Sequence, residues 1–195
     1  GVDTGLISGK TVGVTLGNDT FGPGFESFQS VFSDVSLSTA VDRLRIQAAS
    51  RESQSSNFPF PYNLSINESG DLIIDAVSAS SGNIEVAASG SLDFLAAVQS
   101  LGDINFSSGD AFTVSAPIAT AFGKISITGP EVNVNNSIRV LDGLENFQQT
   151  DVVLTATDGP LVLNDVVLAI NGVKLAANGL NGTITGDARI ISDKV

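Results

Sequence analysis

Apolar and polar residues alternate in short runs along the middle of this chain, and the runs return at a fixed spacing. One phrase, x-Gly-polar-Ile-polar-apolar, occurs three times, at residues 81–86, 101–106 and 122–127. Its isoleucines, Ile84, Ile104 and Ile125, are 20 and then 21 residues apart. Alternation of this kind predicts strands with one buried face. Self-similarity at a fixed period predicts a solenoid in which each repeat is one coil.

Two further apolar series share the same period. One is Leu72, Leu92, Phe112, Val132 and Val152, and the other is Val77, Val98, Ile118 and Ile138. Three apolar strand positions in each repeat predict three parallel sheets around one narrow core. We therefore predict an all-β fold, a single-stranded parallel β-helix (β-solenoid) with about 20 residues and three strands per coil.

The pattern predicts one solenoid domain over residues 1–195, with three parts. Residues 1–41 form an irregular or capping region, residues 42–141 form regular coils with a loop at 51–62, and residues 142–195 form less regular terminal coils. The terminal part fits either smaller coils or an antiparallel hairpin layer, because its strands are closely spaced between glycines. The equal spacing of Leu44, Leu64 and Ile84 predicts that these three residues occupy equivalent positions, and Phe94, Phe106, Phe112 and Phe122 are predicted to fill the interior or its corners.

Near the N-terminus, residues 6–15 resemble a degenerate copy of the repeat, and Val12 and Val14 are predicted to point inward. Phe25, Phe28, Val31 and Phe32 follow at helical spacing. They fit a short amphipathic helix that caps the open end of the solenoid, or an irregular loop that carries aromatic residues.

The loop at 51–62 has two prolines at alternate positions, which exclude a central strand. It carries Phe58, Phe60 and Tyr62. The three rings either fold back onto a side face of the solenoid or form a contact patch for a partner, since loops often carry function.

The amino-acid composition excludes several kinds of reactive site. The chain has no Cys and no His, so disulfides, thiolate nucleophiles and histidine acid–base catalysis are excluded. No apolar run is long enough to span a bilayer. The sequence shows no signal segment, so we expect that any targeting segment has been removed or lies outside it. The formal net charge of −12 argues against nucleic acid as a partner and suits a solvated extracellular surface.

Parallel β-helices also host polysaccharide-cleaving enzymes, so a carbohydrate-active enzyme is the alternative. The candidate acids do not cluster from coil to coil; they are Asp71, Asp93, Asp151, Asp158 and Asp165. No cofactor is expected, and a loosely held structural Ca²⁺ at Asp19 or Asp158 is the one candidate metal. Asn83, Asp103 and Lys124 share one position in the repeat, and their mixed charge argues against an ion ladder.

Two surface patterns bear on the outer faces of the coils. The Asn-x-Ser/Thr sequence occurs at six candidate glycosylation positions, which are Asn18, Asn63, Asn67, Asn105, Asn135 and Asn181. Asn105 is expected to face outward because it lies between Ile104 and Phe106. An ice- or crystal-binding surface would need flat rows of threonine, and Thr11, Thr15, Thr155 and Thr157 are out of phase for that.

The repeats at 80–92 and 122–134 resemble those of filamentous-haemagglutinin-like adhesins and related giant bacterial surface proteins. The resemblance is good over residues 64–141. It implies secretion, a right-handed β-helix and a rod that projects from the cell or builds its outer layer. The resulting hypothesis is an extracellular structural or adhesive β-solenoid without catalysis. Its expected partners are other copies bound end to end or further segments of a longer chain, and glycans. A spacer segment of a secreted adhesin is a further alternative.

Overall fold

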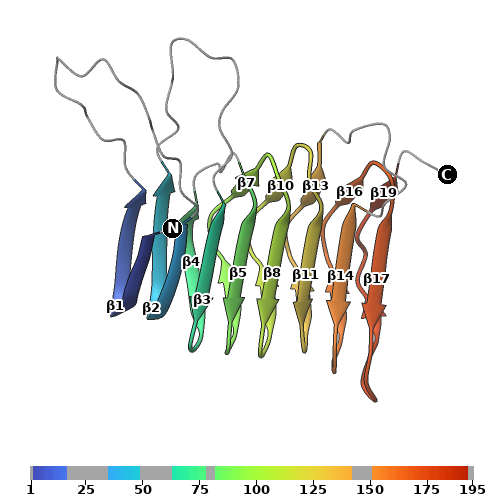
Figure 1. Ribbon diagram of the computed structural model, residues 1–195. Helices are drawn as coiled ribbons and strands as arrows, with labels where there is room; N and C mark the ends of the chain where they lie inside the picture. Colours follow the sequence, from blue (N-terminus) through green and yellow to red (C-terminus); the bar gives the residue numbers. More distant parts are fainter. Residues whose placement is uncertain (1, 17–34, 49–62, 78–81, 142–150, 193–195) are drawn as a thin grey trace, which may run out of the picture.

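A computed structural model describes residues 2–16, 35–48, 63–77, 82–141 and 151–192 of this protein. The described strands lie side by side along one axis, from the N-terminal coil to the C-terminal coil (Figure 1). Every strand pairing among them is parallel, and the described residues contain strands and turns but no helix. The predicted parallel β-helix is therefore confirmed.

The coils form three faces. The first two coils each contribute one long strand, β1 (Val2–Leu16) and β2 (Val35–Ala48), which runs through both the first and the second face. The first face continues with β3 (Leu64–Glu68), β5 (Ile84–Ala88), β8 (Ile104–Ser108), β11 (Ile125–Gly129), β14 (Val152–Ala156) and β17 (Val173–Ala177).

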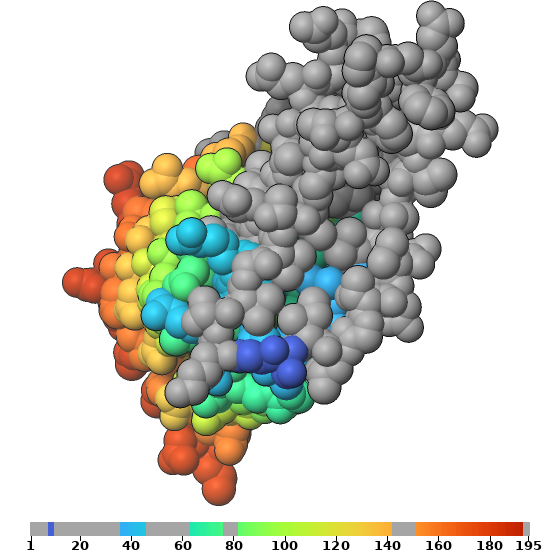
Figure 2. Space-filling view, turned by 90° about the vertical axis from the view of Figure 1, so that its left-hand side faces the viewer, coloured from blue at the N-terminus to red at the C-terminus, as the bar shows by residue number. Residues whose placement is uncertain are grey.

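The second face continues with β4 (Leu72–Val77), β6 (Leu92–Phe94), β9 (Phe112–Val114), β12 (Val132–Val134), β15 (Leu161–Leu163) and β18 (Ile184–Thr185). The third face contains β7 (Val98–Ser100), β10 (Ile118–Thr120), β13 (Ile138–Val140), β16 (Val167–Ala169) and β19 (Ile190–Ser192). Seen along the axis from the N-terminal end, later coils lie behind earlier ones (Figure 2).

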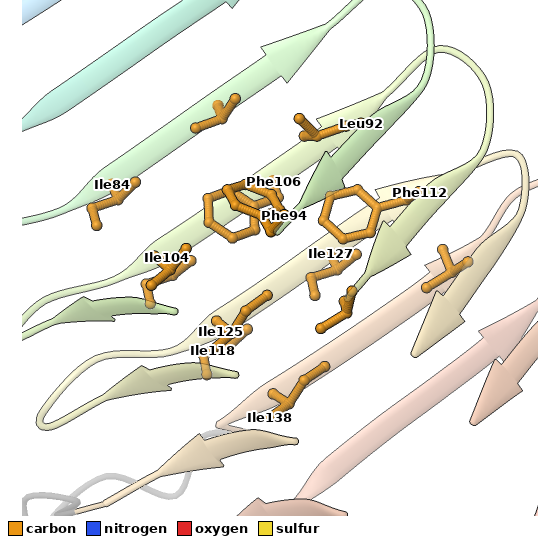
Figure 3. Packing of buried hydrophobic residues seen from close by; sticks show 14 of the residues in the cluster. Ile84, Leu92, Phe94, Ile104, Phe106, Phe112, Ile118, Ile125, Ile127 and Ile138 are labelled. Carbon is orange, nitrogen blue, oxygen red and sulfur yellow. The ribbon is translucent and has the colours of Figure 1, made fainter. Parts of the chain in front are cut away.

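The core is a column of inward side chains that the alternating pattern places between the three faces. In β5, for example, Ile84 and Val86 are buried while Glu85 between them is exposed. Three phenylalanines from neighbouring coils meet near the centre of this column (Figure 3). The ring centroid of Phe94 lies 4.3 Å from that of Phe106 and 5.9 Å from that of Phe112. These three residues fill the interior as predicted.

Of the two positions predicted for Phe122, the interior is wrong, because its side chain is 52% exposed, while the corner is correct. Phe122 lies in the corner between β10 and β11, where its backbone N–H donates to the carbonyl of Leu101 at 3.1 Å. One extra residue in this corner lengthens the step from Ile104 to Ile125 to 21 residues and places the ring outside the core.

The register also corrects the 20-residue series at Val152. This residue lies opposite Ile125 in the first face, while Val132 lies opposite Leu161. The coil that contains residues 142–150 is longer than the coils on either side of it, since Val152 comes 27 positions after Ile125, whereas the adjacent steps are 21 residues. A fixed period therefore assigns Val152 to the wrong face.

A similar shift affects the equivalence predicted for Leu44 and Leu64. Leu64 lies opposite Ile84 as predicted, but its partner in the preceding coil is Val35, while Leu44 lies opposite Ile74. The long coil that contains residues 49–62 breaks the period here. The series of the third face also begins later than predicted, because Val77 belongs to β4 on the second face.

The two ends are more regular than the sequence pattern predicts. The region from residue 1 to 41 contributes all of β1 and the start of β2, and Val12 lies in register with Leu44. At the other end, Val173 follows its partner Val152 by 21 residues. The terminal part therefore consists of parallel coils of ordinary size, and both predicted alternatives, smaller coils and an antiparallel hairpin layer, are wrong. The possible helix at 25–32 and the loop at 51–62 lie outside the described residues.

Close stacking explains the glycine of the repeated phrase. A Cβ atom built on Gly123 would lie 2.2 Å from the carbonyl carbon and oxygen of Gly102 and 2.5 Å from the nitrogen of Asp103. A Cβ atom on Gly102 would similarly lie 3.0 Å from the carbonyl of Gly82. The backbones of successive corners thus touch at this position, and only glycine fits without displacing the neighbouring coil.

We predict that Gly123→Ala lowers the free energy of unfolding by about 1–3 kcal/mol, because the added methyl group overpacks the corner. Gly172→Ala is the matched control, since a Cβ atom there meets nothing within 4 Å. Denaturant unfolding of the two variants and the wild type measures the difference. Equal stability of the two variants would contradict the stacking explanation.

Candidate functional site

The predicted site residues divide into those inside and those outside the described part of the chain. Asn18, Asp19, Phe58, Phe60 and Tyr62 lie outside it, so the calcium prediction at Asp19 and the aromatic contact patch stay predictions. Asp158 is exposed in the corner between β14 and β15. Within the described ranges, no three Asp or Glu side chains come together as a metal-binding group.

The described asparagines of the candidate glycosylation sequences have different surroundings. Asn67 and Asn105 are exposed on the outer side of the first face, in the middle of β3 and β8, and Asn181 is exposed in the turn between β17 and β18. The outward position predicted for Asn105 is therefore confirmed. The side-chain oxygen of Asn135 accepts a hydrogen bond from Nδ2 of Asn164 at 2.9 Å, and that of Asn63 is also occupied.

Asn63 begins a ladder of hydrogen bonds at the corner that leads into the first face. Its Oδ1 accepts from the backbone N–H of Asn83 at 2.9 Å. Oδ1 of Asn83 accepts from the N–H of Asp103 at 2.8 Å, and Oδ1 of Asp103 accepts from the N–H of Lys124 at 2.8 Å. Each side chain thus holds the backbone of the next coil. The position shared by Asn83, Asp103 and Lys124 carries a side-chain-to-backbone ladder, in which both amide and carboxylate oxygens act as acceptors.

A second corner uses an acid in the same way. Oδ1 of Asp71 accepts from the backbone N–H of Ser91 at 2.7 Å and from its hydroxyl at 2.9 Å. These hydrogen bonds, the backbone one above all, hold the pKa of Asp71 below its ordinary value of 3.8, because they stabilise the charged carboxylate.

Buried hydroxyl groups fill the corner after the third face. Oγ1 of Thr120 donates to the carbonyl of Gly102 at 2.6 Å and accepts from the N–H of Gly123 at 3.2 Å. One coil earlier, Oγ of Ser100 donates to the carbonyl of Gly82 and accepts from the N–H of Gly102 at 3.1 Å. These bonds satisfy backbone groups that the tight glycine corner leaves without ladder partners.

Two carboxylates are buried inside the coils. Glu68 occupies an inward position of β3; its Oε2 accepts from the N–H of Val41 at 2.9 Å and its Oε1 accepts from the N–H of Gly70 at 3.0 Å. Asp151, just before β14, accepts from the N–H of Ile170 at 2.7 Å and from the N–H and Nδ2 of Asn171. Sequence reasoning missed both roles. For Glu68, the sequence did contain a signal. Glu68 comes two residues after the inward Ile66, and residues two apart in a strand point to the same side, so its side chain had to point inward as well.

The other candidate acids also contact their own or a neighbouring coil. Oδ1 of Asp93 accepts from the hydroxyl of Ser115, in the next coil, at 2.7 Å. Oδ1 of Asp165 accepts from the N–H of the adjacent Val166 at 2.6 Å. The structure therefore does not bring the five candidate acids together in one groove. Three of them, Asp71, Asp93 and Asp151, accept hydrogen bonds from the next coil, while Asp165 accepts one within its own coil.

The outer side of the first face is a flat surface of small polar residues. From β3 to β11, one outward column consists of Ser65, Glu85, Asn105 and Ser126, and it continues to Val153 and Lys174. The other consists of Asn67, Ala87, Ser107, Thr128 and Thr155. Thr11 lies opposite Arg43, in a column of the second face, so it does not share a row with Thr155. The prediction that the threonines do not line up in one row is therefore confirmed for Thr11 and Thr155.

Comparisons with protein-family models, with curated proteins and with solved structures gave no match. The described residues include no helix that is long and apolar enough to cross a membrane.

We predict that Glu68→Ala destabilises the fold by about 1–3 kcal/mol, because it leaves the buried N–H group of Val41 without an acceptor. Glu85→Ala is the matched control on the neighbouring coil, since that side chain points into solvent. The free energies of unfolding of both variants test this. If the control lost as much stability as Glu68→Ala, the buried hydrogen bonds would not be the cause.

We predict that Asp71→Asn removes part of the acid sensitivity of the fold. An amide oxygen can still accept from Ser91, as that of Asn63 does from Asn83. In the wild type the folded pKa lies below the unfolded one. The charge of Asp71 therefore stabilises the fold fully above the unfolded pKa, and this contribution is lost as the pH falls through the folded pKa.

Thermal unfolding of the wild type and Asp71→Asn, compared between about pH 6 and about pH 3, measures this contribution. The wild type should unfold at the higher temperature at the upper pH, and its advantage should shrink on acidification. A difference between the two proteins that does not change with pH would show that the charge contributes nothing.

Proposed function

We propose that this chain is an extracellular structural or adhesive β-solenoid, a rod- or fibre-forming surface component without catalysis. The observation that carries the proposal is the unbroken, in-register stack of coils. Eight strands of the first face, from β1 to β17, follow one another in parallel. At about 4.8 Å per coil they extend over roughly 35–40 Å along the axis.

The chemistry of the side chains supports a structural role. Asp71, Asp93 and Asp151 hold neighbouring coils together through hydrogen bonds. Groups that a β-helix enzyme would direct at a substrate are here directed at the protein's own backbone and hydroxyl groups. This favours the structural proposal over a carbohydrate-active enzyme.

The outer side of the first face and the net charge of the chain both favour exposure to solvent. The first face presents small polar side chains in flat columns, and the chain as a whole carries a net charge of −12. A strongly acidic surface keeps neighbouring rods apart laterally by repulsion. Location at the cell surface and adhesion to glycans are proposed from the resemblance of the repeats to bacterial surface adhesins.

Electron microscopy of the purified chain tests this function. We predict long, stiff fibres one solenoid wide, with an axial repeat that is a multiple of about 4.8 Å. The same preparation with Ca²⁺ and with a chelator also tests the structural ion predicted at Asp19 or Asp158. Dispersed short rods would instead favour the spacer or adhesin segment, with glycan binding as the next measurement. A compact particle without rod shape would contradict the proposed function.

A further inference from the structure

Among the described residues, two apolar side chains in the strands of the C-terminal coil remain exposed. Ile184 and Ile190 are 50% and 46% exposed, whereas their partners one coil earlier, Leu161 and Val167, are completely buried. β17, β18 and β19 each pair with a described strand on one edge only. The internal coils thus show what one more parallel coil on this end would achieve: it would bury these side chains and pair with the outer edges of β17 and β18.

The N-terminal coil offers a strand of the matching direction. Among the described strands, β1 pairs with β2 alone, so no described strand lies on its other edge. One column of the first face begins at Val2 of β1 and passes through one residue of every coil to Val173 of β17. A second copy stacked on the C-terminal coil would continue this column, with its Val2 opposite Val173.

The adjacent column ends in opposite charges. It begins at Asp3, passes through the exposed residues Ser36 and Glu85, and ends at Lys174. Lys174 is exposed in β17. If the register of the coils continues from one copy into the next, Asp3 of the second copy lies directly opposite Lys174. Oppositely charged residues in such cross-strand positions attract each other.

We propose that copies of this chain associate head to tail, with β1 of one copy added in parallel to β17 and β18 of the preceding copy. The register places Val2 opposite Val173, Asp3 opposite Lys174 and Thr11 opposite Thr185. Such a contact joins two different surfaces and does not close, so it propagates into a fibre. This inference rests on the proposed structural function and specifies the contact through which it operates.

Charge reversal tests the register directly. Lys174→Glu places two acids at the contact, and Asp3→Lys places two bases there. Each variant alone should therefore raise the concentration needed for assembly on the order of tenfold at low salt.

An equimolar mixture of the two variants should assemble like the wild type. In the mixture, the substituted C-terminal coil of the Lys174→Glu variant can meet the substituted N-terminal coil of the Asp3→Lys variant, which again joins an acid to a base. The unchanged Lys174 of the second variant can meet the unchanged Asp3 of the first. Copies of the two variants would therefore alternate along the fibre, and sedimentation velocity and electron microscopy measure the assembly.

Two controls match the changes in net charge. Glu85→Lys alters the middle of the same column, and Arg139→Glu alters an exposed position in β13. Both should assemble like the wild type. Circular dichroism and thermal unfolding of all variants confirm that each is folded.

The outcomes separate this inference from the proposed function. If the wild type forms fibres but neither reversal weakens them, or the mixture does not restore them, the head-to-tail register is wrong while the fibre-forming function stands. If the wild type forms rods that stay single at all concentrations, the end contact between copies is refuted, and a spacer role remains. If no rods form at all, both proposals fail.

Discussion

The structure depends on the parallel hydrogen bonding of each coil to the next in constant register. Because successive backbones lie only about 4.8 Å apart, every position in a coil must tolerate a near-identical neighbour above and below it. This constraint explains why glycine recurs at the corners, where a side chain on Gly123 would collide with Gly102. It also explains why inward positions carry apolar residues that stack in columns, as Ile84, Ile104 and Ile125 do.

The same constraint determines how the polar residues are used. Strands pair along the faces, but the backbone groups at the corners need other partners, and side chains of the adjacent coil supply them. Asn63, Asn83 and Asp103 do this in sequence at one corner, and Asp71 does so at another. Much of the acidic and amide chemistry of the chain is therefore committed to the stack, and the outer surface is left small, polar and repetitive. Such a stack can extend along its axis and resist bending. Its ends expose strand edges, whereas its sides expose outward side chains.

The sequence predicts the fold class and most of the core because the repeat is local. Ile84, Ile104 and Ile125 lie opposite one another as their spacing indicates. The pattern fails where a coil changes length, as before Val152, since a count of residues cannot detect an insertion that precedes it. Among the site residues, the candidate acids are evident from the sequence, but the groups that they bind are not. The N–H group that Glu68 binds lies 27 residues away, and its position depends on the register of the finished coils.

Distances along one column test the central claim of in-register stacking most directly. The chain has no cysteine, so spin labels attached to cysteines introduced in pairs at Lys174 and at Ser36, Ser65 or Glu85 are specific. These pairs are separated by six, five and four coil steps, and pulsed electron paramagnetic resonance should give about 29, 24 and 19 Å. Distances that decrease by one coil spacing from pair to pair would establish the stack. Distances that do not follow the number of coils would contradict it.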